Sequence, residues 1–208
     1  MIPVFSTAYF PSIRYVATLI NHSKVVIEQY ETYPKQTYRN RTVIATANGV
    51  LPLTVPVVRV NGNHTYTKDI EICYAENWAI KHWRAIESAY NSSPYFLYYK
   101  DDVEAVFNKK HSTLLELNMD IIAFVMKKLR LDTEVLLSDD YVEVYDVSED
   151  YRNVFLPKRK EIVSLPQYTQ VFEDRLGFLQ DLSILDLLFN LGPDSITYLK
   201  HCLQSSGY

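Results

Sequence analysis

The spacing of hydrophobic residues changes near position 77. From there, apolar residues recur about every four positions and lie on one face of a helix. The first such set is Trp78, His82, Ile86 and Tyr90. Ser93 is then expected to cap a second helix that has Pro94 at its first position. The apolar positions between Leu114 and Leu129 predict a third helix.

The first thirty residues have a different pattern. A short apolar run at 2–5 is followed by a helix-like run after Pro11 and by a second apolar run at 24–27. This order predicts a β-α-β unit with parallel strands. The turn at Tyr9-Phe10-Pro11 then lies at the carboxyl end of the first strand, where α/β sheets usually bind ligands.

A β-hairpin is predicted around Asn48-Gly49, which lies between two β-rich segments. Pro52 and Pro56 favour an edge position for its second arm. The segment 68–73 is expected to extend the same sheet. The fold class predicted is α/β, with a mixed sheet from the N-terminal half covered by helices from the C-terminal half, and α+β is the alternative.

The last third of the chain begins with an irregular stretch at about 138–171, acidic and then basic, which we expect to be a surface excursion within one domain spanning residues 1–208. Helical spacing returns after Gly177 and is interrupted at Gly192-Pro193. Ser183 and Asp186 match the pattern of a capping box, so we assign Asp186 to a helix cap.

Composition excludes several classes of protein. A net charge of −4, with basic residues scattered along the chain, argues against nucleic acid as a partner. Cys73 and Cys202 form no CxxC pair and suggest a reducing compartment. The N-terminus fits neither a signal peptide nor a membrane span, and we expect a cytoplasmic protein.

Motifs for common chemistries are missing. The five glycines form neither a Walker loop nor a dinucleotide fingerprint, and there is no G-x-S-x-G sequence. The five histidines are too far apart for a helical metal pair, so no metal site is predicted. No cofactor can be named.

Among the residues that remain, His82 is a candidate general base, because imidazole titrates near neutrality. The plainer alternative is a hydrogen-bonded histidine of the core. Tyr9 and Tyr15 could hold a sugar, or they could pack the first helix onto the sheet. Alternation would place Arg39 and Arg41 on one face, where they could bind a carboxylate or phosphate, or remain solvated charges at a sheet edge.

The sequence resembles the WbqC-like protein family over most of its length. The resemblance rests on the order and spacing of several segments, which are AYFP, YRNRTVI, LPLTVPV, the stretch from Trp78 to Phe96, and LSILDLLFNLGP. It implies a role in bacterial O-antigen or surface-polysaccharide synthesis, with glycine transfer as a suggested activity. The positions that match the family pattern are Tyr9, Phe10, Pro11, Tyr15, Asn40, Arg41, Trp78, His82, Tyr90, Tyr95 and Phe96.

The chain departs from the family at one place. Many relatives carry an Asp-Asp pair after the second strand, where this chain has Gln29 and Tyr30 between Glu28 and Glu31. Either the carboxylate has moved or activity has been lost.

The leading hypothesis is a transferase that moves an acyl or aminoacyl group to a sugar or sugar-nucleotide intermediate. His82 would take the acceptor proton, Asn40 and Arg41 would hold the donor, and Tyr9, Tyr15 and Tyr90 would line the site. The alternative is a non-catalytic module that binds a sugar intermediate or a partner enzyme. A nucleotidyltransferase-like site ranks last, because its turn reads YFPSIRY and lacks histidines. Oligomeric state is left open.

Overall fold

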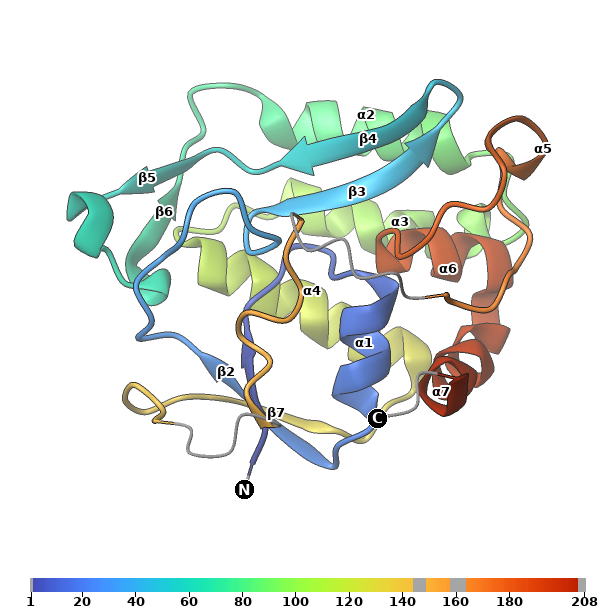
Figure 1. The fold of residues 1–208 in the computed structure, drawn as a ribbon. Helices are drawn as coiled ribbons and strands as arrows, with labels where there is room; N and C mark the ends of the chain where they lie inside the picture. The colour runs from blue at the N-terminus through green and yellow to red at the C-terminus, as the bar shows by residue number, and fades with distance from the viewer. Residues whose placement is uncertain (1, 144–148, 158–163, 206–208) are drawn as a thin grey trace.

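A computed structural model describes residues 2–143, 149–157 and 164–205. Its parallel sheet has the strand order β1-β2-β7 (Figure 1). Strand β1 (Val4–Ser6) runs parallel to β2 (Lys24–Glu28) across helix α1 (Ile13–Ile20), which confirms the predicted β-α-β unit. The third strand, β7 (Glu134–Leu137), was not predicted and pairs with β2.

The hairpin is confirmed, but it does not belong to this sheet. Strands β3 (Arg41–Thr46) and β4 (Gly49–Thr54) form a separate antiparallel pair, with Thr46 opposite Gly49. The other edge of β3 is bonded to the segment before α6, where the Ser183 amide donates to the Val43 carbonyl. Strand β6 (Ile70–Ile72), from the segment expected to extend the sheet, pairs instead with β5 (Val57–Arg59).

In the described part of the chain, six further helices follow or cover these strands. They are α2 (Trp78–Tyr90), α3 (Phe96–Asn108), α4 (Leu114–Leu129), α5 (Glu173–Leu176), α6 (Ile184–Leu191) and α7 (Ser195–Ser205). Short 3-10 turns lie at η1 (Gly62–His64), η2 (Thr67–Asp69) and η4 (Gly192–Asp194). The mixed α/β class is therefore confirmed.

The predicted start of α3 was wrong. The helix begins at Phe96, with Tyr95 as its N-cap residue. Ser93 does not cap it, because the Ser93 hydroxyl donates to the Tyr90 carbonyl at the end of α2. The Ser93 amide also donates to the Tyr90 carbonyl. Ser93 therefore closes the end of α2 and does not start α3.

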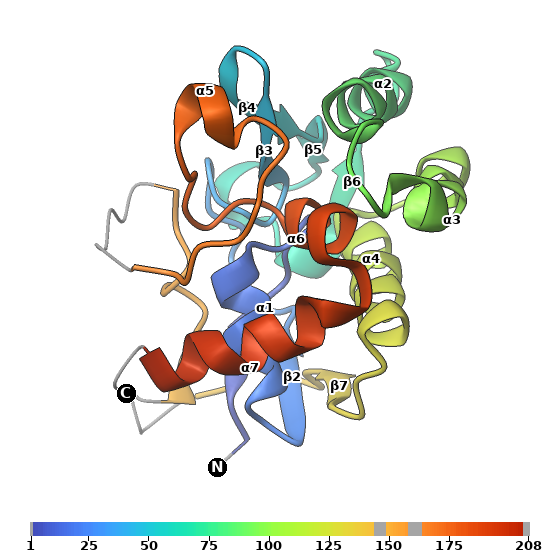
Figure 2. The same ribbon diagram turned by 90° about the vertical axis from the view of Figure 1, so that its right-hand side faces the viewer.

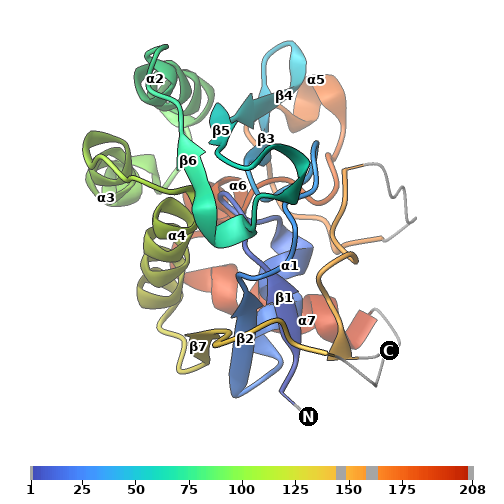
Figure 3. The same ribbon diagram turned by 90° about the vertical axis from the view of Figure 1, so that its left-hand side faces the viewer.

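The strands and helices gather at two opposite ends of the molecule. The parallel sheet lies at one end with α1 and α7 side by side, as Figures 1 and 2 show, and the hairpin lies at the other end with α2. Figure 3 shows α4 running beside β6 toward β7. Within the described ranges, no helix is both long and apolar enough to cross a membrane.

Candidate functional site

The turn after β1 joins the two ends of the molecule. The Phe10 carbonyl accepts hydrogen bonds from the hydroxyls of Thr42, in β3, and Ser183, before α6, at 2.7 and 3.2 Å. Phe10 itself has a φ of 39°, in the left-handed region that bulky residues avoid. A strained and fully buried turn at the carboxyl end of a parallel strand is a typical place for a functional site.

Tyr9 and His82 form a pair beside this turn. The Tyr9 hydroxyl lies 2.9 Å from Nδ1 of His82, although the two residues are 73 positions apart in sequence. The Tyr9 amide donates to the Tyr38 carbonyl, which fixes the turn against the segment leading into β3. The structure thus joins two of the predicted site residues directly.

The His82 imidazole is buried and neutral. Only 6% of the residue is exposed, and its ring lies against Trp78, 5.3 Å away between centroids, and near Phe107. Burial lowers the pKa of His82 from 6.5 to about 4, opposed in part by a hydrogen bond to the Thr54 backbone. With the ring donating to Thr54, Nδ1 is the acceptor and Tyr9 is the donor, a tautomer assigned from these partners.

A titration tests this state of His82. Followed by NMR, the imidazole should stay neutral down to about pH 5, because protonation places an uncompensated charge in an apolar site. The unfolded chain binds this proton near pH 6.5, so folding stability falls by up to about 3 kcal/mol as the pH drops from 6.5 to 4. The His82→Gln variant identifies the resonance, and a midpoint near 6.5 would contradict the burial described here.

Tyr15 and Tyr90 are both tied into the core. The Tyr15 hydroxyl donates to the Ser6 carbonyl at 2.8 Å, at the end of β1, and the ring packs on Phe5 and Phe155. The Tyr90 hydroxyl accepts the Ala45 amide at 3.3 Å. Burial raises the pKa of Tyr90, and the nearby Asp186 charge raises it further. Tyr15 is therefore bonded to the end of β1, while Tyr90 is bonded to the backbone of β3.

The three residues 39–41, which lead into β3, have separate partners. Arg39 is 1% exposed and donates through Nε and Nη2 to the two carboxylate oxygens of Glu31, both at 2.7 Å. The Asn40 amide nitrogen donates to the Val55 carbonyl at 2.8 Å, whereas Nε of the partly exposed Arg41 donates to the Thr54 hydroxyl. Both roles expected for Arg39, a solvated edge charge and a guanidinium that binds a ligand's carboxylate or phosphate together with Arg41, are wrong, because its side chain is buried and its guanidinium is bonded to Glu31.

Asp186 was assigned wrongly to a helix cap. Ser183 does cap α6, but the Asp186 side chain is fully buried and does not accept the Ser183 amide, which donates to the Val43 carbonyl instead. Its Oδ2 accepts from the Tyr168 hydroxyl at 2.6 Å, and from the amides of Gln170 and Asn190 at 3.3 and 3.4 Å. Burial raises the pKa of Asp186, and these donors oppose the shift. The carboxyl group thus fastens the 165–171 segment to α6.

Glu28, at the end of β2, is a second buried acid, whose burial the sequence did not predict. Its carboxylate accepts from the Ser138 hydroxyl and from the Tyr30 and Val142 amides at 2.7–2.9 Å. Arg152 lies 3.6 Å from it and also pairs with Asp150.

These contacts bear on the departure at Gln29-Tyr30. The two flanking acids, Glu28 and Glu31, are each bound to an arginine, Arg152 and Arg39. The Glu31 carboxylate is occupied by two bonds from Arg39, and the Glu28 carboxylate is occupied by Ser138, Tyr30 and Val142. Neither acid is therefore free to replace a catalytic pair.

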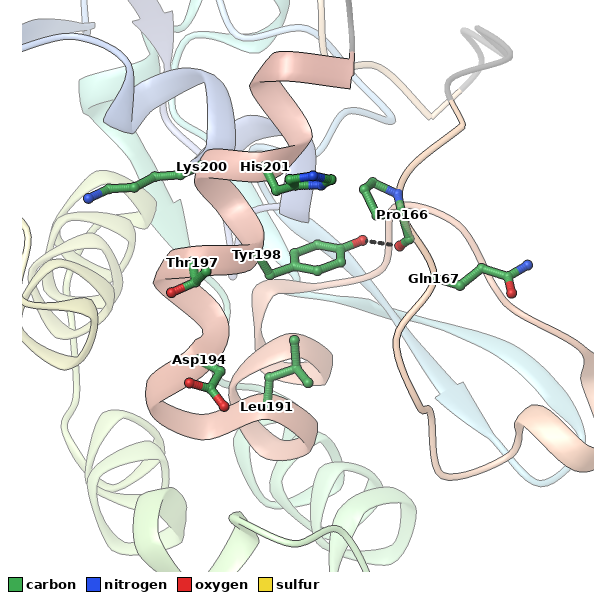
Figure 4. A pocket seen from close by; sticks show the side chains of 8 residues that line it. All are labelled: Pro166, Gln167, Leu191, Asp194, Thr197, Tyr198, Lys200 and His201. Atoms are coloured by element: carbon green, nitrogen blue, oxygen red, sulfur yellow. Dashed lines mark hydrogen bonds between the residues drawn. The ribbon is translucent and has the colours of Figure 1, made fainter.

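A pocket of about 560 Å³ lies elsewhere, between α7 and the 166–167 segment (Figure 4). Its lining residues are Pro166, Gln167, Leu191, Asp194, Thr197, Tyr198, Lys200 and His201. The Tyr198 hydroxyl donates to the Pro166 carbonyl at its edge. None of the residues predicted from the sequence as a site lines this pocket. In the described ranges no three His, Cys, Asp or Glu residues are grouped to hold a metal ion.

These observations describe a mixed α/β protein with a buried Tyr-His pair at a strained turn after its first parallel strand. The chain belongs to the WbqC-like protein family, whose model matches residues 7–156. It is similar to Uncharacterized protein Rv1507c of Mycobacterium tuberculosis, with 26% identity over 98% of this chain and 99% of the relative. No solved structure matches. The matched range contains every site residue predicted from the sequence and ends before Asp186.

Proposed function

We propose that this protein is a transferase of bacterial surface-polysaccharide synthesis, which moves an acyl or aminoacyl group, such as glycyl, onto a sugar intermediate. Membership of the WbqC-like family supports the pathway. The observation that supports the chemistry is the hydrogen bond between Tyr9 and His82 at the turn after β1.

In this proposal, an amine or hydroxyl of the sugar attacks the acyl carbon and loses its proton to the Tyr9 oxygen. Tyr9 passes its own proton to Nδ1 of His82, and the bond to the donor's leaving group breaks. Because the pKa of His82 is only about 4, the imidazolium gives the proton back readily, and the leaving group takes it. Arg41 and Asn40 hold the donor, and Tyr15 and Tyr90 support the site.

This chemistry requires access to a buried pair. Tyr9 is fully buried and His82 almost so, which means that substrate binding must expose the Tyr9 hydroxyl. Catalytic hydrogen bonds commonly rearrange when a substrate binds.

A comparison of polysaccharides tests the pathway. A strain lacking the protein should produce a repeat unit whose mass is lower by one acyl or aminoacyl group, and the wild-type gene should restore it. The measurement is mass spectrometry of the purified polysaccharide. An identical repeat unit in both strains would remove the proposed function.

The second candidate is a non-catalytic module that binds a sugar intermediate or a partner enzyme. The burial of His82 against Trp78 favours it, since both ring nitrogens already have partners in the folded chain. A module tolerates loss of the Tyr9 hydroxyl if the fold survives, whereas the transferase does not.

A further inference from the structure

Two tyrosine rings meet at the surface just after β2. Tyr30 lies two residues beyond the end of this strand, and its ring centre is 6.4 Å from that of Tyr66, with the two ring planes inclined at 67°. The Lys68 ammonium lies 4.2 Å from the centre of the Tyr30 ring. Tyr66 is 46% exposed, and Tyr30 and Lys68 are partly exposed. We call these three side chains the Tyr30–Tyr66–Lys68 surface.

Hydrogen bonds fix the backbone that carries these side chains. The Lys68 amide donates to the Gln29 carbonyl at 3.0 Å, which joins the two segments of the surface. The Tyr30 amide donates to the carboxylate of the fully buried Glu28 at 2.7 Å. The attraction between the ammonium and the ring face holds Lys68 over Tyr30. The surface is therefore in place before a ligand arrives, which reduces the entropy lost on binding.

Lys68 and the two phenols can bond to a ligand. Within the residues that the structure describes, neither the Tyr30 nor the Tyr66 hydroxyl makes a hydrogen bond, and Lys68 forms no ion pair. Lys128 also lies near a tyrosine ring, but it pairs with Asp102. The Tyr30–Tyr66–Lys68 surface thus has three groups that can donate hydrogen bonds to a ligand.

The ring of a pyranose sugar matches these groups. The C–H groups on one face of such a ring pack against the electron-rich face of a tyrosine, and its hydroxyls bond to donors around it. Tyr66 has an exposed ring, and Tyr30 and Lys68 lie beside it. A diphosphate matches the surface poorly, because Lys68 supplies one positive charge and its neighbour in the chain is the partly exposed Asp69.

We propose that the Tyr30–Tyr66–Lys68 surface binds a sugar residue of the acceptor glycan, with the sugar ring stacked on Tyr66 and its hydroxyls bonded to Tyr30 and Lys68. The surface follows the carboxyl end of β2, the edge where α/β sheets bind ligands. An oligosaccharide acceptor extends over several rings, so the residue that stacks here need not be the one that reacts. The role of this glycan as a substrate rests on the proposed function, but the binding of a sugar ring does not.

Proton NMR with the repeat-unit oligosaccharide, prepared from the polysaccharide of the deletion strain, tests this surface. Binding to the wild-type protein should move the C–H signals of one sugar residue upfield, because these protons lie over an aromatic face. Tyr66→Ala should weaken binding about tenfold or more and abolish this shift, whereas Tyr66→Phe should bind within about twofold of the wild type. Lys68→Gln should weaken binding about threefold. The exposed Tyr98→Ala on α3 is the matched control and should bind as the wild type does.

Three results would overturn this inference: no binding to the wild type, unchanged binding to a folded Tyr66→Ala variant, or displacement of the oligosaccharide by uridine diphosphate. Thermal unfolding of each variant shows that it is folded. Binding with the expected losses, but with no change in the polysaccharide of the deletion strain, would leave the surface standing and remove the proposed function. A changed polysaccharide without binding would do the reverse.

Discussion

Replacing Asp186 by alanine is expected to lower the free energy of unfolding by about 4 kcal/mol. The carboxyl group is fully buried and accepts from Tyr168, Gln170 and Asn190. Its removal leaves these donors unsatisfied in the core, and each such group costs about 1–3 kcal/mol. Urea unfolding at neutral pH measures the loss.

Two substitutions serve as controls for Asp186. Asp186→Asn keeps one acceptor oxygen and should cost about 1–2 kcal/mol. Asp194→Ala removes an exposed acid in η4, just after α6, and should change the free energy of unfolding by less than about 0.5 kcal/mol. A loss below about 1 kcal/mol for Asp186→Ala would mean that the buried acceptor contributes little.

Replacing Arg39 by methionine should cost about 3–5 kcal/mol. The change leaves Glu31 without its bidentate partner and removes the bond from Arg39 to the Arg152 carbonyl. The double variant Arg39→Met with Glu31→Leu should recover much of the loss, because a buried ion pair can be replaced by apolar side chains at little net cost. If the double variant is less stable than Arg39→Met alone, the ion pair is not the source of the effect.

Local patterns predicted the local structure well. Helical spacing identified α2 and α4, and the alternation around Asn48-Gly49 identified the hairpin. These elements are determined by contacts within a few residues, which the sequence displays directly. The β-α-β unit follows from the same kind of short-range order.

Pairing over long distances was not visible in the sequence. Strand β7 reads EVLL, too short a run to be recognised, and it joins β2 from more than a hundred residues away. The sequence of a β-rich segment also does not show which strand it will pair with. For this reason the hairpin was wrongly assigned to the sheet of β1 and β2, although it forms a separate sheet. The capping assignment of Asp186 failed because the same spacing also fits an acid that faces the core, and α6 is buried on nearly every side.

The candidate site shows the same difference between local features, which the sequence predicted, and long-range contacts, which it did not. Periodicity placed His82 on a buried face, and the turn after β1 was located correctly. The bond between Tyr9 and His82 joins residues 73 positions apart, and the ion pairs of Glu28 and Arg39 depend on segments that only the fold brings together. Charged residues that pattern alone would place in solvent can be buried once such partners exist.

The most direct test of the account is the polysaccharide made by a strain that carries only Tyr9→Phe, at wild-type protein level. This variant removes one hydroxyl and keeps the ring, at a cost of about 1–3 kcal/mol for the unpaired imidazole nitrogen. The exposed Tyr98→Phe is the matched control. We predict a repeat unit that lacks the acyl or aminoacyl group with Tyr9→Phe and a complete one with Tyr98→Phe. A complete repeat unit from a folded Tyr9→Phe protein would contradict a catalytic role for the Tyr9–His82 pair.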